Sequence, residues 1–523
     1  MPAWWYGLVA GVLAGAAAVG AGQLAAGIVG PLSSPIAQVG QLQIAIAPQW
    51  LETFAIRTFG PNDKRALVVG IMVILGLIAA GLGILALHRL VFGLIGLSVL
   101  TAFGLFASVS RPDFSPVDSV PTVVAALVGV VALCVLVRSA PPKPFAVVRL
   151  PGSQERLPDL STTGTTLVDR RQFLTLGVGT AMVTAAAVVG GGVLGERLSV
   201  AALRAALVLP SPRRPTRPLP PGAELHIPGL APFVTPNAQF YRVDTAIILP
   251  EINPNNWHLV IHGMVDKEID LSFDDLLRMP LTEHYITLTC VSNPVGGPYI
   301  GNADWLGASL ATVLRRAGIQ SGAEQLLSTS TDGYTCSTPV EAVMDGRDAL
   351  LAVGMNGSPL PIAHGFPVRM VLPGLYGYVS ATKWLTDIKV TTYAAEAAYW
   401  TERGWAQRGP IKTESRIDVP RPGGPIPPGR TTVAGVAWAQ HKGIDAVEVS
   451  VDSGPWHSAH LAAVPGIDTW RQWVWNWEAT RGTHTLQARA TDATGYTQTA
   501  SIAGTVPNGA TGYPTVVVTV GSV

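Results

Sequence analysis

Cysteine is the residue type in this chain best suited to redox or metal chemistry, and there are only three: Cys134, Cys290 and Cys336. Cys290 ends the strand-like run Y-I-T-L-T and begins C-V-S-N-P-V-G-G, a loop rich in turn-forming residues. A cysteine at a strand end is often only a small buried hydrophobic side chain. Strand ends are also where sites are built, and a soft thiolate suits a soft, redox-active metal. Cys290 is therefore the candidate metal ligand.

Other common site types lack their motifs. The cysteines form no CxxC or CxxCH, which argues against a disulfide scaffold, a zinc ribbon and c-type haem. Haem b usually needs two axial histidines, and His88 is the only histidine in the first two hundred residues. We therefore expect neither haem nor an iron-sulfur cluster. No GxGxxG follows a strand-like run and no GxxxxGK[ST] occurs, and a net charge of +1 gives no basic field for nucleic acid.

The elements that must position Cys290 mix strands with helices. Strand-like runs cover Trp257 to Ile261, Tyr285 to Thr289, Val368 to Leu372 and Ile388 to Thr392. Helical segments at Ser272 to Arg278 and Ser309 to Ala317 each begin with a serine that can cap the helix. This pattern predicts an α+β domain over residues 223–419.

The last block, residues 420–523, alternates apolar and polar residues between Gly, Pro, Asp and Asn turns. The alternation predicts an all-β, immunoglobulin-like sandwich. We expect its tryptophans to pack the core or an interface, with carbohydrate binding as the alternative; they are Trp438, Trp473, Trp475 and Trp477.

The first part of the chain is a membrane region. The composition is 48% hydrophobic and 13% charged, and the apolar excess lies almost wholly in the first two hundred residues. Residues 1–195 contain five runs long enough to cross a bilayer. They are Trp4 to Val29, Ala66 to Leu87, Leu90 to Ser108, Val120 to Val137 and Leu174 to Leu194. Only His88-Arg89 separates the second run from the third, so one crossing fewer is the alternative.

Charge placement predicts the orientation of these spans. The segment after the fourth run carries Arg138, Lys143, Arg149, Arg156, Arg170 and Arg171, which by the positive-inside rule is cytoplasmic. The residues after Leu194 then lie on the extracytoplasmic side of the cell membrane. D-R-R-Q-F-L, Asp169 to Leu174, resembles a twin-arginine export signal, with ordinary topology anchors as the alternative. We expect residues 196–222 to form a stiff Pro-rich linker.

Nine ordered motifs across the second half resemble the molybdopterin domain of the sulfite-oxidase superfamily. They include T-P-N-x-x-F-Y from Thr235, L-T-C-x-S-N from Leu288, D-G-Y from Asp332, H-G-F-P-V-R from His364 and K-W-L from Lys383. The final block is similar to that family's dimerisation domain through G-V-A-W and V-E-V-S-V-D-x-G-x-W. The membrane region lies outside the resemblance.

The resemblance implies roles for particular residues. Cys290 would bind molybdenum beside the pterin dithiolene. His364 and Arg369 would hold the anionic pterin or its phosphate, for which the planar donor fork of arginine is suited. Lys383, Ser380 and Thr382 would add donors around the same phosphate. Asn293 and Asp332 would orient the cysteine loop and the pterin.

The chain departs from sulfite oxidases where they hold their anionic substrate. The cysteine loop continues with Pro294 and carries no arginine. Arg242 falls one residue early, which on a strand would point it to the other face. Trp405 stands where those enzymes have an active-site tyrosine. We keep Arg242 and Trp405 as candidate catalytic residues and expect a less cationic pocket.

The sequence therefore predicts a membrane-anchored molybdenum oxidoreductase that transfers an oxygen atom to or from an S-oxide, an N-oxide or a sulfite-like substrate. Electrons would pass to or from an external quinone or cytochrome, and the last domain could form a homodimer. The alternative is a membrane-tethered scaffold or adhesion protein that uses the immunoglobulin-like domain. A hydrolase has neither a G-x-S-x-G nor an H-E-x-x-H motif to build on.

Overall fold

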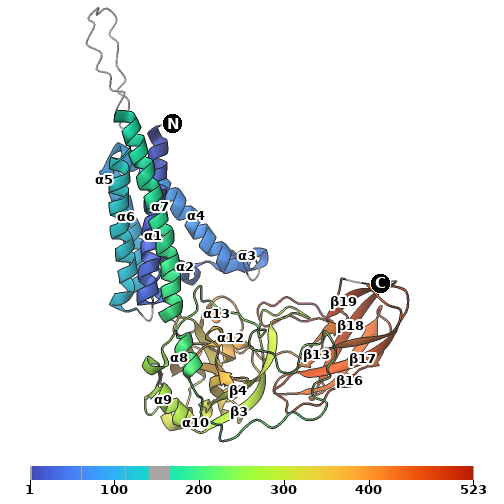
Figure 1. The fold of residues 1–523 in the computed structure, drawn as a ribbon. Helices are drawn as coiled ribbons and strands as arrows, with labels where there is room; N and C mark the ends of the chain where they lie inside the picture. The colour runs from blue at the N-terminus through green and yellow to red at the C-terminus, as the bar shows by residue number, and fades with distance from the viewer. Residues whose placement is uncertain are drawn as a thin grey trace, which may run out of the picture. The chain divides into compact units, whose positions relative to one another are not determined.

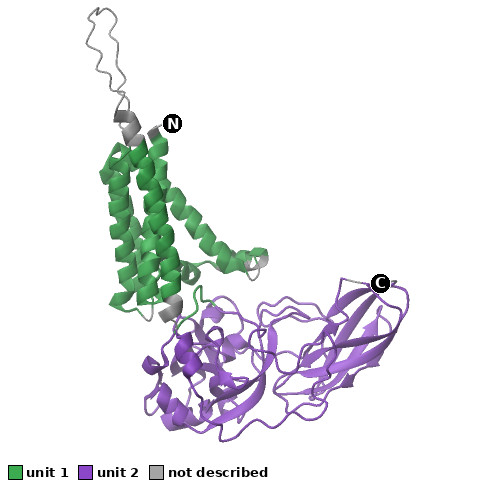
Figure 2. Ribbon diagram, in the orientation of Figure 1, with its two compact units in different colours: residues 1–199, 245–251 green, residues 200–244, 252–523 purple. Residues whose placement is uncertain are grey.

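The structure is a computed structural model that describes residues 3–59, 62–111, 114–140, 165–198, 200–423 and 425–521. It contains two compact units (Figure 2). Unit 1 comprises residues 1–199 and 245–251, and unit 2 comprises residues 200–244 and 252–523. Lys143, Arg149 and Arg156, which supported the predicted orientation, lie outside the described residues, as do the side chains of Asp169 and Arg170 in the arginine motif.

The described residues of unit 1 include five helices long and apolar enough to cross a membrane, which agrees with the five predicted runs. They are α1 (Ala3–Val29), α4 (Asp63–His88), α5 (Leu90–Val109), α6 (Val120–Arg138) and α7 (Thr165–Leu198) (Figure 1). The extended backbone of Arg89 separates α4 from α5, so the His88-Arg89 break divides two helices. Large apolar side chains such as Leu77 and Val183 are about 70% exposed on them, as expected of helices that face lipid.

Glycines bring α1 into close contact with its neighbours in unit 1. A Cβ on Gly11 would lie 2.0 Å from the carbonyl oxygen of Ala79 in α4, and one on Gly27 would lie 2.4 Å from that of Gly191 in α7. Small residues of this kind let membrane helices approach until their backbones touch, and van der Waals packing then holds them together.

Two shorter helices, α2 (Pro35–Ile46) and α3 (Gln49–Phe59), follow α1 and were not predicted. Gln38 of α2 is buried, and its amide donates to the Ser108 hydroxyl and to the carbonyl oxygen of Asp118. These bonds join α2 to the end of α5 and to the 3-10 helix η3 (Pro116–Ser119) before α6. Unit 1 also includes residues 245–251, where Lys64 donates to the carbonyl oxygen of Ala246.

One mixed sheet, in which β1 and β10 are parallel, and one antiparallel sheet form the first half of unit 2, in line with the α+β prediction. One has the order β2-β1-β10-β5-β6, and the other β3-β4-β7-β8 with β9 paired to β7. The strands are β1 (His258–Gly263), β2 (Ile269–Ser272), β3 (Leu281–Thr289), β4 (Ile300–Ser309), β5 (Gln325–Ser330), β6 (Thr335–Pro339), β7 (Leu350–Met355), β8 (Ser358–Pro359), β9 (Arg369–Val371) and β10 (Leu385–Thr391).

Serine caps begin two of the helices that cover these sheets, as predicted. The Ser272 hydroxyl accepts from the backbone N–H of Asp275 at the start of α9 (Phe273–Arg278), and Ser309 does the same for α10 (Leu310–Ala317). The remaining helices of unit 2 are α8 (Ala201–Ala206), η4 (Pro254–Asn256), α11 (Val340–Met344), η5 (Ile362–His364), α12 (Gly377–Ser380) and α13 (Tyr399–Glu402).

The second half of unit 2 consists of two further sheets, with orders β11-β13-β17-β16 and β12-β19-β18-β14-β15. Their strands are β11 (Glu414–Val419), β12 (Pro425–Ile426), β13 (Gly429–Trp438), β14 (Ile444–Val451), β15 (Trp456–Ser458), β16 (His460–Leu461), β17 (Arg471–Ala479), β18 (Gly482–Asp492) and β19 (Thr515–Val520). Trp438, Trp473 and Trp477 are buried, which favours packing over carbohydrate binding. The immunoglobulin-like assignment itself stays a prediction.

Two expected segment boundaries differ in detail from the structure. The Pro-rich stretch before Gly222 is attached to the domain by two backbone hydrogen bonds. The N–H of Arg213 donates to the carbonyl oxygen of Leu281, and the N–H of Glu283 donates to that of Arg214. These bonds attach it to β3. At the other boundary, β11 ends at Val419 but already pairs with β13. The Pro- and Gly-rich composition therefore shows where the chain leaves regular secondary structure. It does not show which sheet the neighbouring residues pair with.

Candidate active site

Cys290 directly follows β3, at the start of a loop that closes on itself. Its backbone N–H donates to the carbonyl oxygen of Tyr299, and its own carbonyl oxygen accepts from the N–H of Asn293 at 3.0 Å. The Asn293 side-chain oxygen accepts from the N–H of Tyr299 at 2.8 Å. A Cβ on Gly297 would lie 2.6 Å from that oxygen, so the tight turn requires glycine there. These contacts join Asn293 to both ends of the cysteine loop, and its role in orienting the loop stays a prediction.

The thiol of Cys290 lies among aromatic hydroxyls and one lysine. Its sulfur is 3.0 Å from the Ser292 hydroxyl. Burial raises the pKa of the thiol, while the Ser292 contacts and the charge of Lys383 act in the opposite direction. A negative charge on the Cys290 sulfur would raise the pKa of three nearby tyrosine hydroxyls, those of Tyr241, Tyr334 and Tyr376. The surroundings thus favour a neutral thiol until a positively charged partner such as a metal ion binds it.

Arg369, at the start of β9, is a buried cation without a carboxylate partner among the described residues. Its guanidinium donates to the carbonyl oxygens of His364, Met370 and Ala381, and it stacks over the Trp305 ring at 4.9 Å. Burial lowers its pKa to about 10. Three of its five N–H groups are thereby engaged. A buried positive charge of this kind is costly unless an anion accompanies it.

Lys383 and Arg242 share one acid, Asp244. The Lys383 ammonium lies 2.8 Å from the Asp244 carboxylate, and the Arg242 guanidinium lies 2.6 Å from it. Burial lowers the pKa of Lys383 to about 8, and Asp244 limits that fall. Asp244 was not predicted. The candidate catalytic residue Arg242 lies near the site but directs its charge toward Asp244, and its side chain is 39% exposed.

His364, in η5, is buried beside the same cations. Its Nε2 lies 3.0 Å from the carbonyl oxygen of Asn237, which requires a hydrogen on that nitrogen. Burial and the charge of Arg369 lower its pKa to about 4, so the ring is neutral near pH 7. Phe240 packs edge-on against it. A neutral His364 can therefore offer Nδ1 as an acceptor, while the positive charge of the site comes from Arg369 and Lys383.

The two hydroxyls predicted to join Lys383 make other contacts. The Ser380 hydroxyl donates to the carbonyl oxygens of Leu375 and Tyr376, which leaves it no hydrogen for a phosphate. The Thr382 hydroxyl lies 2.7 Å from that of Ser328 in β5. Both are fully buried. Ser380 thus stabilises the backbone around α12, and Thr382 joins the segment before β10 to β5. Both residues are close to Lys383 in the sequence.

Two buried donors near these groups have no hydrogen-bond partner among the described residues: the side-chain nitrogen of Asn293 and the hydroxyl of Ser330. Ser330 ends β5, and its carbonyl oxygen accepts from the N–H of Gly333 in the turn that contains Asp332. The Asp332 carboxylate accepts from the N–H of Tyr334. Buried unpaired donors usually indicate an absent acceptor.

Trp405 packs against Tyr378 and Trp400, with ring centroids 6.0 Å away in each case. It is therefore one of a group of aromatic side chains, and Tyr378 in turn accepts at its carbonyl oxygen from the Tyr334 hydroxyl. Among the described contacts, Trp405 reaches Cys290 only through these tyrosines. Its predicted catalytic role has no direct contact to support it.

The residues fit an anionic cofactor that brings its own metal. Among the described residues, no three His, Cys, Asp or Glu side chains form a metal site, so Cys290 would be a single protein ligand. The buried Arg369 and Lys383 supply positive charge, and the unpaired donors of Asn293 and Ser330 supply hydrogen bonds. Such a site suits a metal whose other ligands come from a negatively charged organic group.

Comparisons with known proteins agree with this chemistry. The family model described as "Oxidoreductase molybdopterin binding domain" matches residues 246–400. The sulfite oxidase of Gallus gallus is 32% identical over 296 residues, which cover 47% of this chain and 63% of that protein. The uncharacterized oxidoreductase YuiH of Bacillus subtilis (strain 168) is 33% identical over 153 residues, which cover 29% of this chain and 74% of that protein.

The fold and the site thus define a molybdopterin-dependent oxidoreductase. The chain belongs to the sulfite-oxidase superfamily of these enzymes, and its cofactor is molybdopterin. The match spans less than two thirds of the length of the Gallus gallus protein. Among solved structures, the sulfane dehydrogenase SoxCD from Paracoccus pantotrophus is similar at 24% identity and a TM-score of 0.48, covering 56% of this chain and 84% of that one. Membership of an enzyme family removes the support for a non-catalytic scaffold.

Proposed function

We propose that the protein catalyses oxygen-atom transfer at a molybdenum centre bound by Cys290. The observation that carries this proposal is the position of the Cys290 thiol, at the end of β3 and within electrostatic reach of the buried Lys383. The bound cofactor would supply a two-electron molybdenum couple that takes up or releases an oxygen atom. Arg369 and Lys383 would bind the anionic part of the cofactor, and Asn293 would hold the loop that presents the thiol.

The proposed substrate is a neutral or organic S-oxide or N-oxide. Two of the cations around Cys290 already share the carboxylate of Asp244, and the third, Arg369, is fully buried. Arg369 and Lys383 are assigned to the cofactor and Arg242 is paired with Asp244, so none of the three is left to bind a dianion such as sulfite. Each charge-assisted hydrogen bond that is missing would cost about 1.5–3 kcal/mol of binding, so a pocket with two such contacts fewer loses sulfite affinity by more than a hundredfold.

Substrate preference can be measured on the purified, molybdenum-loaded full-length protein. Methionine sulfoxide and trimethylamine N-oxide would be reduced with a reduced viologen as electron donor, and sulfite would be oxidised with ferricyanide as acceptor. We expect kcat/KM for at least one oxide to exceed that for sulfite by a hundredfold or more. Cys290→Ser is the matched control, because it keeps a small polar side chain but removes the thiolate. Higher kcat/KM for sulfite in the wild type would reject the proposed substrate class.

We also infer that α1, α4, α5, α6 and α7 span the cell membrane and that unit 2 is outside the cytoplasm. The exposed apolar side chains of these helices support the first part, and the Lys and Arg residues from Arg138 to Arg171 support the second. An external quinone or cytochrome would exchange the electrons. Reporter fusions after Leu194 and after Arg138 test the orientation: the first should report an external location and the second a cytoplasmic one. The reverse pattern would overturn it.

A further inference from the structure

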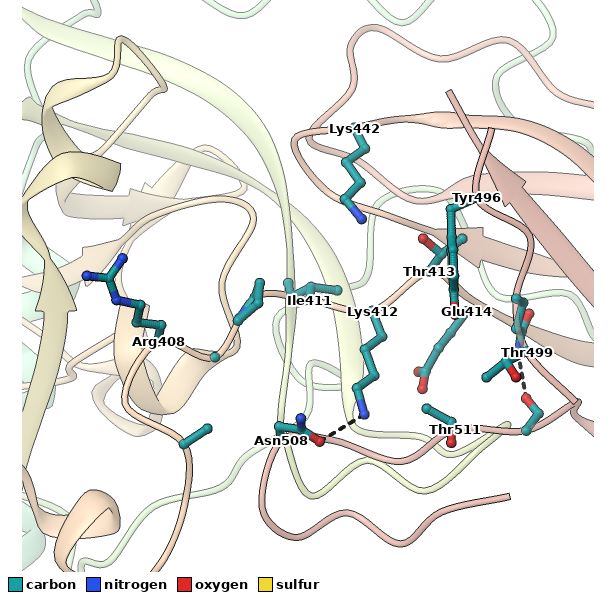
Figure 3. A pocket seen from close by; sticks show the side chains of 15 residues that line it. Arg408, Ile411, Lys412, Thr413, Glu414, Lys442, Tyr496, Thr499, Asn508 and Thr511 are labelled. Atoms are coloured by element: carbon teal, nitrogen blue, oxygen red, sulfur yellow. Dashed lines mark hydrogen bonds between the residues drawn. The ribbon is translucent and has the colours of Figure 1, made fainter. Parts of the chain in front are cut away.

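A cavity of about 360 Å³ lies inside unit 2, and none of the residues assigned to the cofactor lines it. The segment from Ala406 to Glu414 forms one wall, and Lys442, Tyr496 and the loop ending at Gly512 form the other (Figure 3). The wall residues thus come from the end of the first half of unit 2 and from its two C-terminal sheets. The volume is within the range typical of small-molecule sites.

Glu414, the first residue of β11, points its carboxyl group into this cavity (Figure 3). The side chain is 3% exposed, and its Oε1 has no hydrogen-bond partner among the described residues. Burial raises the pKa of Glu414 to about 8, and the charge of Lys412 limits the rise. Near pH 7 the group is therefore mostly a carboxylic acid, with a hydroxyl that can donate a hydrogen bond.

Lys412 provides the positive charge of the cavity. Its ammonium donates to the side-chain oxygen of Asn508 at 3.0 Å and to the carbonyl oxygen of Gly509, and it forms no ion pair among the described residues. The other two cations of the walls are already neutralised. Lys442 lies 3.4 Å from Asp492, and Arg408 lies 2.6 Å from Glu341. With Glu414 protonated, one positive charge remains uncompensated.

We propose that this cavity binds a small organic anion, a carboxylate with a compact apolar body. One carboxylate oxygen would accept from the Lys412 ammonium and the other from the protonated Glu414, while the apolar body would pack against Pro410 and Ile411. The ligand supplies the acceptor that Glu414 lacks and the negative charge that Lys412 lacks. This ligand site is additional to the proposed catalytic function and does not depend on it.

Protonation of Glu414 makes the binding depend on pH. The titratable groups that face or surround Glu414 are Lys412, the Tyr376 hydroxyl behind it, the Lys442–Asp492 pair, Tyr496 and the Arg408–Glu341 pair at the rim. Ionisation of Glu414 would place a second negative charge against the ligand. If only the protonated form binds, the apparent Kd rises about tenfold between pH 7 and pH 9.

Calorimetric titration of the full-length protein in detergent tests this site, with benzoate as the probe and benzamide as its neutral analogue. Wild-type protein should bind benzoate at least tenfold more tightly than benzamide at pH 7, and about tenfold more weakly at pH 9 than at pH 7. Lys412→Met should lose benzoate binding, whereas Lys267→Met, which removes an exposed lysine elsewhere, should retain it. Glu414→Gln keeps a donor without a titratable proton, so most of the tenfold weakening between pH 7 and pH 9 should disappear.

Several results would overturn the proposal. One is the absence of benzoate binding by wild-type protein whose sharp thermal transition shows that it is folded. The others are unchanged benzoate binding by Lys412→Met and an unchanged pH dependence of binding in Glu414→Gln. Molybdenum content is measured on the same samples. Because benzoate binding needs neither turnover nor metal, a failure of this site is distinguishable from a failure of the proposed function.

Discussion

Glu414→Gln should change how the stability of unit 2 depends on pH. In the folded chain, burial holds the Glu414 carboxyl in its protonated form up to a pKa of about 8, against an ordinary value of 4.5. Between these two values the unfolded chain ionises while the folded chain does not. The unfolded state is then favoured as pH rises, so the wild type loses stability across this window, and the loss is complete above pH 8. Glutamine cannot ionise and removes this loss.

The size of the effect follows from the same two pKa values. Each pH unit between them costs about 1.4 kcal/mol, so the wild type should lose on the order of 4 kcal/mol relative to Glu414→Gln between pH 5 and pH 8. For a unit of this size, one kcal/mol changes Tm by roughly 2 °C. The Tm values of the two proteins should therefore diverge by several degrees, with the variant more stable at the higher pH.

Thermal unfolding followed by tryptophan fluorescence, at half-unit steps from pH 5 to pH 9, measures this divergence in the full-length protein. Glu341→Gln is the matched control, because Glu341 is exposed and pairs with Arg408 at the surface. Its Tm should follow that of the wild type to within about 1 °C. Parallel Tm curves for wild type and Glu414→Gln would refute the assignment of a neutral buried carboxyl at this position.

Three further substitutions test the site around Cys290. Asp244→Asn leaves Lys383 buried without its carboxylate, so it should destabilise unit 2 by about 3 kcal/mol. Combined with Lys383→Met, the same substitution should destabilise the unit much less. Additive losses of stability for the two substitutions in thermal unfolding would contradict the pairing. Arg369→Lys keeps the charge but not the planar donors, so pterin content after purification should fall several-fold, and an unchanged content would exclude Arg369 as a cofactor ligand. Asn293→Ala breaks the bond to the backbone of the cysteine loop and should cost about 1 kcal/mol, with a lower molybdenum content; a full metal load would show that the loop does not need it.

Local sequence signals predicted the five long apolar helices of unit 1 and two of the helices of unit 2, and missed the shorter ones such as α2 and α3. Hydropathy over about 20 residues located the five long apolar helices, because the length and composition needed to cross a bilayer are properties of the segment itself. Ser272 and Ser309 marked the starts of α9 and α10, because a cap bonds to an N–H three residues away. The docking of the Pro-rich segment on β3 depends on residues about seventy positions away, so composition predicted a stiff linker but not its attachment to the sheet.

Features of the candidate site that depend on contiguous residues could be predicted from the sequence, whereas contacts between residues far apart in the chain could not. The turn formers after Cys290 indicated a tight loop, and the structure has one. Asp244 left no comparable signal, since its importance comes from Lys383, 139 positions away. Ser380 shows the opposite case: its place beside Lys383 in the sequence suggested a phosphate donor, but its hydroxyl donates to the preceding turn of the backbone.

Elemental analysis for molybdenum, with pterin assayed in the same samples, tests the central claim most directly. Full-length wild type, Cys290→Ala and the surface control Lys267→Met would be purified from a host that makes the cofactor. We expect near-stoichiometric molybdenum and pterin in the wild type and in Lys267→Met, and a loss of metal or a changed Mo(V) signal in Cys290→Ala. Folded wild-type protein that contains neither molybdenum nor pterin, or a Cys290→Ala variant with the same metal content and the same Mo(V) signal, would contradict it.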